Sequence, residues 1–187
     1  GQTQSPEEGR WALRHKVKHR HAAAACSHQR AAEHLLEGGH QAGLAHQNDP
    51  GQPLQRLLDE EQPEALCVTF DRREPTFRHQ ADERYKAQRK GMPEELAMQL
   101  PYLKQVLSAM NIPQYDLTGY EADDLIGTIS RRCEASGWDC VIVTGDKDSL
   151  QLITPHTKVK LVSTRMGQTT TKDMTEETFR EQYGFAP

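Results

Sequence analysis

Residues 1–55 of this 187-residue chain contain no Ile, Phe, Tyr or Met, and their other strongly apolar side chains are sparse. A segment with so little apolar surface cannot offset the entropy lost on folding. We therefore expect residues 1–55 to be a low-complexity, disordered or mistranslated segment, with at most a weak helix near Arg30–Leu36. Seven of the nine histidines lie here. A metal-binding tract is the weaker alternative, because their spacing is irregular and no Cys or carboxylate cluster accompanies them.

Long apolar runs are also missing. No stretch approaches the roughly 20 apolar residues that cross a bilayer, and no apolar run follows the first basic residues, so neither a membrane span nor a signal peptide is predicted. The four cysteines form no CxxC pair, which favours reduced thiols in a cytoplasmic protein. The net charge of −4 argues against binding nucleic acid by bulk charge, so any such contact must be local.

The remainder, residues 56–187, has a normal apolar content and alternates between strand and helix patterns. The expected strands are Ala65–Phe70, Cys140–Val143, Val159–Val162 and a short Thr169–Thr171, and the expected helices are Pro93–Met110, Thr118–Ser136 and Thr175–Tyr183. This alternation predicts an α/β fold with a mainly parallel sheet flanked by helices. Such sheets place ligands at the carboxyl ends of their strands.

Acidic residues stand at those predicted ends. Asp71 follows the first strand, and Asp146 and Asp148 follow the second in Thr144-Gly-Asp-Lys-Asp. Glu121, Asp123 and Asp124 open a helix in Gly119-Tyr-Glu-Ala-Asp-Asp. Six carboxylates gathered at one edge would repel one another strongly unless cations were bound among them.

Bound hard divalent cations would neutralise the charge that causes this repulsion. Mg²⁺ and Mn²⁺ prefer carboxylate and water oxygens. Two such ions can activate water and stabilise both oxygens of a phosphodiester displacement. They also reverse the local sign of charge, which lets an anionic substrate approach.

Each acidic group has a purely structural interpretation as well. Glu121 stands three residues after Thr118, which is a capping-box spacing, and acids in a first helical turn are favourable anyway. Gly145-Asp146 is an ordinary turn, and Asp71 could simply end a strand. Singly these interpretations are the better ones, but three groups at one predicted edge favour a metal site.

A basic run follows Asp71 directly and is interrupted by aromatic residues. Its cations are Arg72, Arg73, Arg78, Arg84, Lys86, Arg89 and Lys90, with Phe77 and Tyr85 between them. Cations that contact phosphates, together with an aromatic ring that stacks on bases, can hold single-stranded nucleic acid. A solvated surface helix is the alternative, and the position beside Asp71 favours the functional interpretation.

Five short segments follow one another along the chain, and their order and spacing match those of a known family. They are Phe70-Asp71, Thr76-Phe-Arg78, Tyr85-Lys-Ala-Gln-Arg89, the Glu-Ala-Asp-Asp motif and the Thr-Gly-Asp-Lys-Asp motif. Over about residues 57–187 the chain resembles the N-terminal 5′→3′ exonuclease domain of bacterial DNA polymerase I, a relative of the flap endonucleases. The combination of the last two motifs is highly specific.

The resemblance implies a PIN-like, resolvase-like 5′-nuclease core with a helical arch. It implies a two-metal hydrolase, using Mg²⁺ or Mn²⁺, that cuts DNA at 5′ flaps and 5′ ends in replication and repair. A monomer in the bacterial cytoplasm, associated with the nucleoid and not with a membrane, is expected.

Residue roles come from the same resemblance. Metal ligands would be Asp71, Glu121, Asp123, Asp124, Asp146 and Asp148, with Asp71 and Asp124 also counted as catalytic. Lys86 would be catalytic, matching the lysine at the scissile phosphate. DNA contacts would come from Arg78, Tyr85, Lys86, Arg89 and Lys90.

The chain departs from the family pattern at both ends. The family begins with an apolar strand ending in an Asp ligand, and residues 1–55 show no such strand. The family continues past Pro187 into a further acidic pair and a helix-turn-helix module. We therefore expect a fragment with little nuclease activity. One alternative is a non-catalytic remnant that binds single-stranded nucleic acid. A second is a small-molecule phosphohydrolase, but the basic run argues against it because a small substrate needs no such run.

Overall fold

The computed structural model describes residues 20–27, 52–82, 84–88, 92–165 and 168–187. Six strands form one sheet in the order β3-β2-β1-β4-β5-β6. The strands are β1 (Arg20–Ser27), β2 (Ala65–Phe70), β3 (Gln114–Tyr115), β4 (Trp138–Thr144), β5 (Thr157–Arg165) and β6 (Gln168–Met174). All neighbours are parallel except β5 and β6, which form an antiparallel hairpin at one edge.

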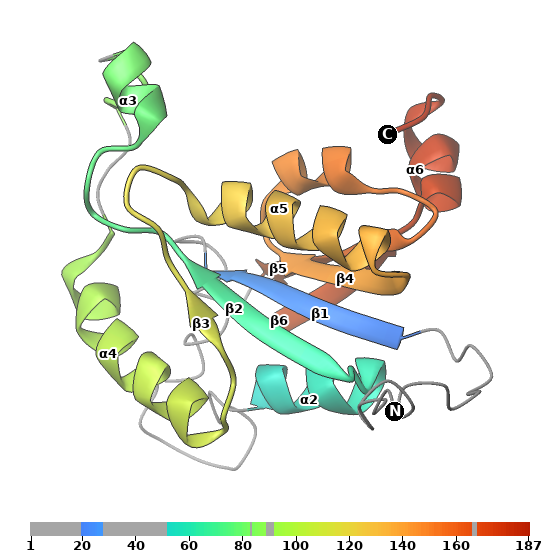
Figure 1. The fold of residues 1–187 in the computed structure, drawn as a ribbon, viewed down its shortest axis with the longest axis horizontal. Helices are drawn as coiled ribbons and strands as arrows, with labels where there is room; N and C mark the ends of the chain where they lie inside the picture. Colours follow the sequence, from blue (N-terminus) through green and yellow to red (C-terminus); the bar gives the residue numbers. More distant parts are fainter. Residues whose placement is uncertain (1–19, 28–51, 83, 89–91, 166–167) are drawn as a thin grey trace, which may run out of the picture.

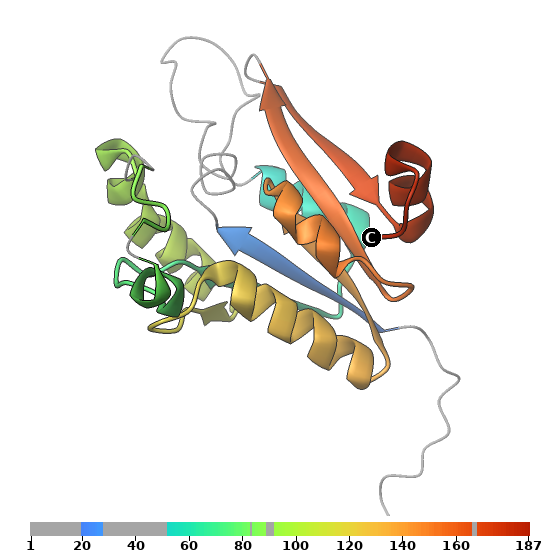
Figure 2. The same cartoon turned by 90° about the horizontal axis from the view of Figure 1, so that it is seen from above.

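Helices cover both faces of this sheet (Figures 1 and 2). They are α2 (Gln52–Glu61), α4 (Glu94–Ala109), α5 (Ala122–Ala135), the 3₁₀-helix η2 (Lys147–Leu152) and α6 (Glu176–Tyr183). The short helix α3 (Phe77–Ala81) stands apart from the sheet (Figure 1). The predicted α/β class with a mainly parallel sheet is confirmed. No helix among the described residues is long and apolar enough to cross a membrane.

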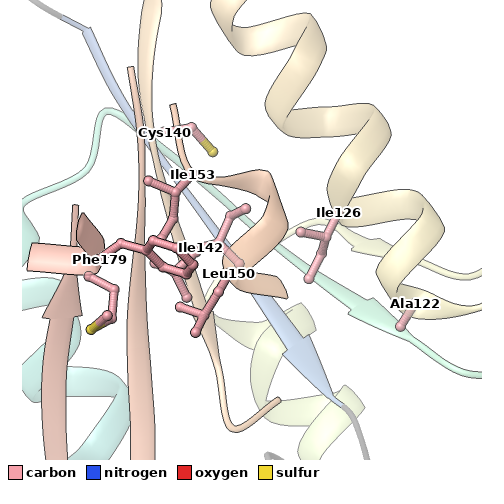
Figure 3. Close-up of a cluster of buried hydrophobic side chains, with 9 residues drawn as sticks. Ala122, Ile126, Cys140, Ile142, Leu150, Ile153 and Phe179 are labelled. Carbon is pink, nitrogen blue, oxygen red and sulfur yellow. The ribbon is translucent and has the colours of Figure 1, made fainter. Parts of the chain in front are cut away.

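Two apolar cores lie on opposite faces of the sheet, because successive strand residues point to opposite sides. On β4, Ile142 belongs to the core beneath α5, η2 and α6, whereas the next residue, Val143, packs against the core beneath α2 and α4. Figure 3 shows the first of these cores, to which α5 contributes Ile126, η2 contributes Leu150 and α6 contributes Phe179. The result is a three-layer helix–sheet–helix arrangement.

The prediction that residues 1–55 contain no strand is wrong for Arg20–Ser27. These residues form β1, which lies at the middle of the sheet between β2 and β4. Its four consecutive alanines have a low intrinsic strand propensity, so local pattern argued against a strand. The strand conformation comes from parallel pairing with a strand on each side, in which Ala24 lies opposite both Cys67 and Ile142. The predicted helix near Arg30–Leu36 lies outside the described residues.

Other predicted elements are confirmed with shifted bounds. The helix predicted from Thr118 begins at Ala122, so Glu121 is its N-cap residue, not the third residue after a Thr118 cap. Gly119 sits before it with φ of 86°, a conformation that glycine adopts without strain. Cys67, Cys133 and Cys140 are free thiols, as expected, and burial raises the pKa of Cys67 to about 11 and that of Cys140 to about 12.

A buried ion network attaches α2 to the β5–β6 hairpin. Lys160 of β5 is only 5% exposed, and its ammonium lies 2.9 Å from Glu61 of α2 and 2.8 Å from Asp173 of β6. Lys158 binds the same two carboxylates at 2.9 and 3.1 Å. These contacts hold the antiparallel edge of the sheet against α2.

Candidate active site at the carboxyl edge of the sheet

The carboxyl ends of β1, β2 and β4 lie at the same edge, because Ser27 pairs with Phe70 and Ala25 pairs with Val143. Asp71 follows Phe70, and Asp146 follows Thr144 by two residues. The predicted placement of these two acids at strand ends is therefore observed. Parallel α/β sheets carry their ligand sites at this edge.

Asp71 joins the end of β2 to the start of α5. Its Oδ1 atom accepts a hydrogen bond of 2.7 Å from the backbone N–H of Ala122, in the first turn of α5. The first N–H groups of a helix lack intrahelical partners and carry partial positive charge, so a carboxylate is stabilised there. Sequence reasoning missed this contact, which fixes where α5 begins relative to the strand.

Glu121 is the buried member of the acidic set, with 7% of its surface exposed. Its carboxylate accepts hydrogen bonds from the Lys86 ammonium at 2.8 Å and from the Tyr85 hydroxyl at 3.2 Å. Lys86 has a φ of 57°, in the left-handed region that few non-glycine residues occupy. A strained residue held by a buried ion pair is typical of functional sites.

Asp124 is held by Arg78 through a two-pronged contact. The two guanidinium nitrogens donate to the two carboxylate oxygens, each at 2.7 Å, and the Glu121 backbone N–H donates to the same carboxylate at 2.9 Å. These hydrogen bonds, the one from Arg78 first, hold the pKa of Asp124 below its usual range. Arg78 belongs to α3, which stands apart from the sheet beyond the end of β2 (Figure 1).

Asp146 and Asp148 form the turn after β4. Asp146 accepts a 2.9 Å hydrogen bond from the backbone N–H of Asp148, and its own N–H donates to the Thr144 hydroxyl at 3.0 Å. Asp146 is thereby the N-cap of η2. The Gly-Asp turn interpretation is therefore confirmed. The role of Asp146 as a metal ligand stays a prediction, made for an acid that lies at the sheet edge.

A cavity of about 670 Å³ lies between α5 and η2. Three of the six acids, Asp123, Asp124 and Asp148, line it together with Arg78. Oxygen donors of this kind suit a hard divalent cation. Within the described ranges, however, no three His, Cys, Asp or Glu side chains close around a single point as a metal cluster would. The donor chemistry therefore fits such ions, while the ligand set remains a prediction.

The predicted basic run is brought to the acids only in part. Arg78, Tyr85 and Lys86 reach Glu121 or Asp124, while Arg89 and Lys90 lie outside the described residues. His79, which sequence reasoning missed, packs edge-on against Tyr85 with ring centroids 5.2 Å apart. Its spacing of three residues from Thr76, whose backbone N–H donates to the His79 ring, was the available signal.

The described residues thus form a three-layer α/β domain, with acids at the carboxyl edge of its sheet and cations from an adjoining segment bound to two of them. The family model described as "5'-3' exonuclease, N-terminal resolvase-like domain" matches residues 50–184. The chain belongs to this 5′-3′ exonuclease family.

Curated relatives agree with this assignment. DNA polymerase I of Bacillus caldotenax is 42% identical over 134 residues, and that of Caldicellulosiruptor bescii is 43% identical over 129 residues. The matches cover 72% and 69% of this chain. They cover only 15% of each relative, so the chain spans about a seventh of the length of these proteins.

Solved structures share the fold at lower identity. The bacteriophage T5 D15 flap endonuclease, solved as a complex with DNA and metal ions, has a TM-score of 0.61 at 19% identity. The match covers 88% of this chain and 61% of that one. T5 5′-exonuclease with bound zinc gives the same TM-score at 17% identity. At these identities the likeness establishes the fold, including the PIN-like core predicted from the sequence.

Proposed function

We propose that the carboxyl edge of the sheet is a divalent-metal site that hydrolyses phosphodiester bonds of DNA at 5′ flaps and 5′ ends. The observation that carries the proposal is that Glu121 and Asp124 bind cations of the segment after β2, while Asp71 binds the first turn of the same helix, at the sheet edge where α/β folds bind ligands. The named relatives are DNA polymerases I, so DNA replication and repair are the setting we infer, with chromosomal DNA of the nucleoid as the partner.

Two Mg²⁺ or Mn²⁺ ions, when bound, would supply charge for the reacting phosphate and its attacking and leaving oxygens. The six carboxylates, Asp71, Glu121, Asp123, Asp124, Asp146 and Asp148, would hold them directly or through water. Lys86 is the proposed contact to the scissile phosphate. Arg78, Tyr85, Arg89 and Lys90 would guide the 5′ strand.

One feature of the sequence limits this site. No Asp or Glu occurs in residues 9–32, so β1 and its immediate flanks contribute no carboxylate to the edge where β2 contributes Asp71. Each carboxylate removed from an oxygen-ligand site weakens its affinity for a divalent ion. We therefore propose that cleavage by this chain is slow. The family membership favours this weak nuclease over a non-catalytic binding remnant.

The test is cleavage of a labelled 5′-flap duplex in Mg²⁺ or Mn²⁺. We expect slow cleavage by the parent protein, none by Asp146→Asn, and an unchanged rate for the exposed control Glu177→Gln. His28→Asp, which places a carboxylate directly after β1, should raise the rate. Cleavage that survives Asp146→Asn would refute the assignment of the site, and robust cleavage by the parent would refute the limiting role of β1.

A further inference from the structure

The cavity between α5 and η2 extends beyond the acids along the outer side of α5. The inner side of that helix is buried against the sheet through Ala122, Ile126 and Ser130, and Figure 3 shows Ile126 directed into the core. The cavity lining on α5 includes Asp124, Thr128 and Arg131. These positions recur every three or four residues, so they lie on one helical face.

The two ends of this groove carry opposite charge. Asp123, Asp124 and Asp148 line one end together with Arg78, which is bound to Asp124, so that end keeps a net negative charge; Arg131 and Arg132 line the other. At about 1.5 Å per residue, Arg131 lies roughly 10 Å along the helix from Asp124. Charges at that separation are largely screened from each other at physiological salt. The arginines are therefore not the counter-ions of the acids.

Arg131 is free to take an external anion. Its side chain is 75% exposed, and its ion pair with Glu134 has an N···O distance of 3.9 Å. An exposed pair of this length contributes little to stability, so a phosphate can replace it at small cost. Arginine presents a planar fork of donors that matches phosphate geometry.

We propose that Arg131 and Arg132 form a second DNA-backbone site, which holds the substrate strand roughly 10 Å from the acidic end of the groove. The proposal rests on the proposed function, because the acidic end must receive the phosphodiester that is cut. None of the residues lining the groove is aromatic. Contact is therefore with the backbone and independent of base sequence.

The groove site also differs from the segment after β2. Arg78, Tyr85 and Lys86 approach Glu121 and Asp124 from α3 and the turn that follows it. Arg131 and Arg132 lie in the last two turns of α5, toward its carboxyl end. A strand lying in the groove would thus be held on both sides of the acids, which fixes the reacting phosphate between two anchors.

The test is binding of a fluorescein-labelled 5′-flap duplex, followed by fluorescence anisotropy in Ca²⁺ from 50 to 200 mM NaCl. Arg131→Gln/Arg132→Gln should raise Kd about tenfold and reduce the slope of log K against log salt by about 1.5 to 2, as expected for two lost phosphate contacts. The matched control is Arg56→Gln/Arg180→Gln, which removes exposed arginines of α2 and α6 outside the groove. It should leave the slope unchanged.

The outcomes separate the two proposals. A parent protein that binds DNA while the groove variant binds with the same Kd and slope overturns the groove site and leaves the proposed function standing. A parent that binds no DNA overturns both. Equal losses in the groove and control variants also overturn the groove site, because the effect is then one of net charge. Circular dichroism melting of both variants checks that each is folded.

Discussion

The contact between Arg78 and Asp124 joins the segment after β2 to the first turn of α5, and its removal should be measurable. Two charge-assisted hydrogen bonds of this kind contribute about 1.5–3 kcal/mol when shielded from solvent. The Arg78 side chain is 33% exposed and that of Asp124 is 22% exposed. Solvent screening therefore reduces the expected coupling to about 1–2 kcal/mol.

A double-mutant cycle isolates that coupling. The variants are Arg78→Gln, Asp124→Asn and the pair, and the free energy of unfolding is measured by urea denaturation at pH 7. Each single variant should lower the free energy of unfolding. The double variant should lower it by about 1–2 kcal/mol less than the sum of the two single losses, because the interaction is lost in each single variant but counted only once in the pair. The control is Arg180→Gln, at an exposed arginine of α6.

The coupling free energy between Arg78 and Asp124 should decrease as pH falls. Arg78 lowers the pKa of Asp124 in the folded state. A lowered folded-state pKa contributes stability above the unfolded value, near 3.9, and this contribution is lost as pH falls through the lowered value. The coupling should therefore be full at pH 7 and vanish in strong acid. Equal coupling at pH 7 and pH 2, or none at pH 7, would refute the reasoning.

Three further predictions concern stability, each measured by urea denaturation. Lys160→Met leaves Glu61 and Asp173 to Lys158 alone and should cost about 2–4 kcal/mol; an unchanged midpoint would show that Lys158 suffices. Leu107→Ala, at a side chain 1% exposed, should cost about 2–5 kcal/mol, and a cost below 1 would contradict close packing there. Thr175→Ala removes the N-cap hydroxyl of α6, which accepts from the Thr178 N–H, and should cost about 1 kcal/mol; no loss would mean that the cap is not formed in solution.

Strands and the acids that follow them could be predicted from the sequence where the local residue pattern alone determines the structure. The run Ala65–Phe70 is apolar enough to predict a buried strand, and the acid that follows it is at the sheet edge as expected. The same holds for β4 and the turn at Asp146. In both places the strand signal and the acid are adjacent in the chain, so no long-range information was needed.

Local pattern failed where partners are distant. The alanines of β1 form a strand because they pair with β2 and β4, which are distant in sequence. Ala24 lies opposite Cys67, 43 residues later, and opposite Ile142, 118 residues later. The pairing of Arg78 with Asp124 crosses 46 residues. Spacing along the chain could place both residues near the edge, but it could not show which acid each cation would bind.

The central claim is that the acids at the carboxyl edge of the sheet bind divalent ions. Titration of the protein with Mn²⁺, with free Mn²⁺ measured by electron paramagnetic resonance, tests it without depending on cleavage. We expect saturable binding by the parent, strongly weakened binding by Asp146→Asn and Asp124→Asn, and parental binding by Glu177→Gln. Binding that is equal in all four proteins would contradict the claim, as would a parent that binds no Mn²⁺ at millimolar concentration.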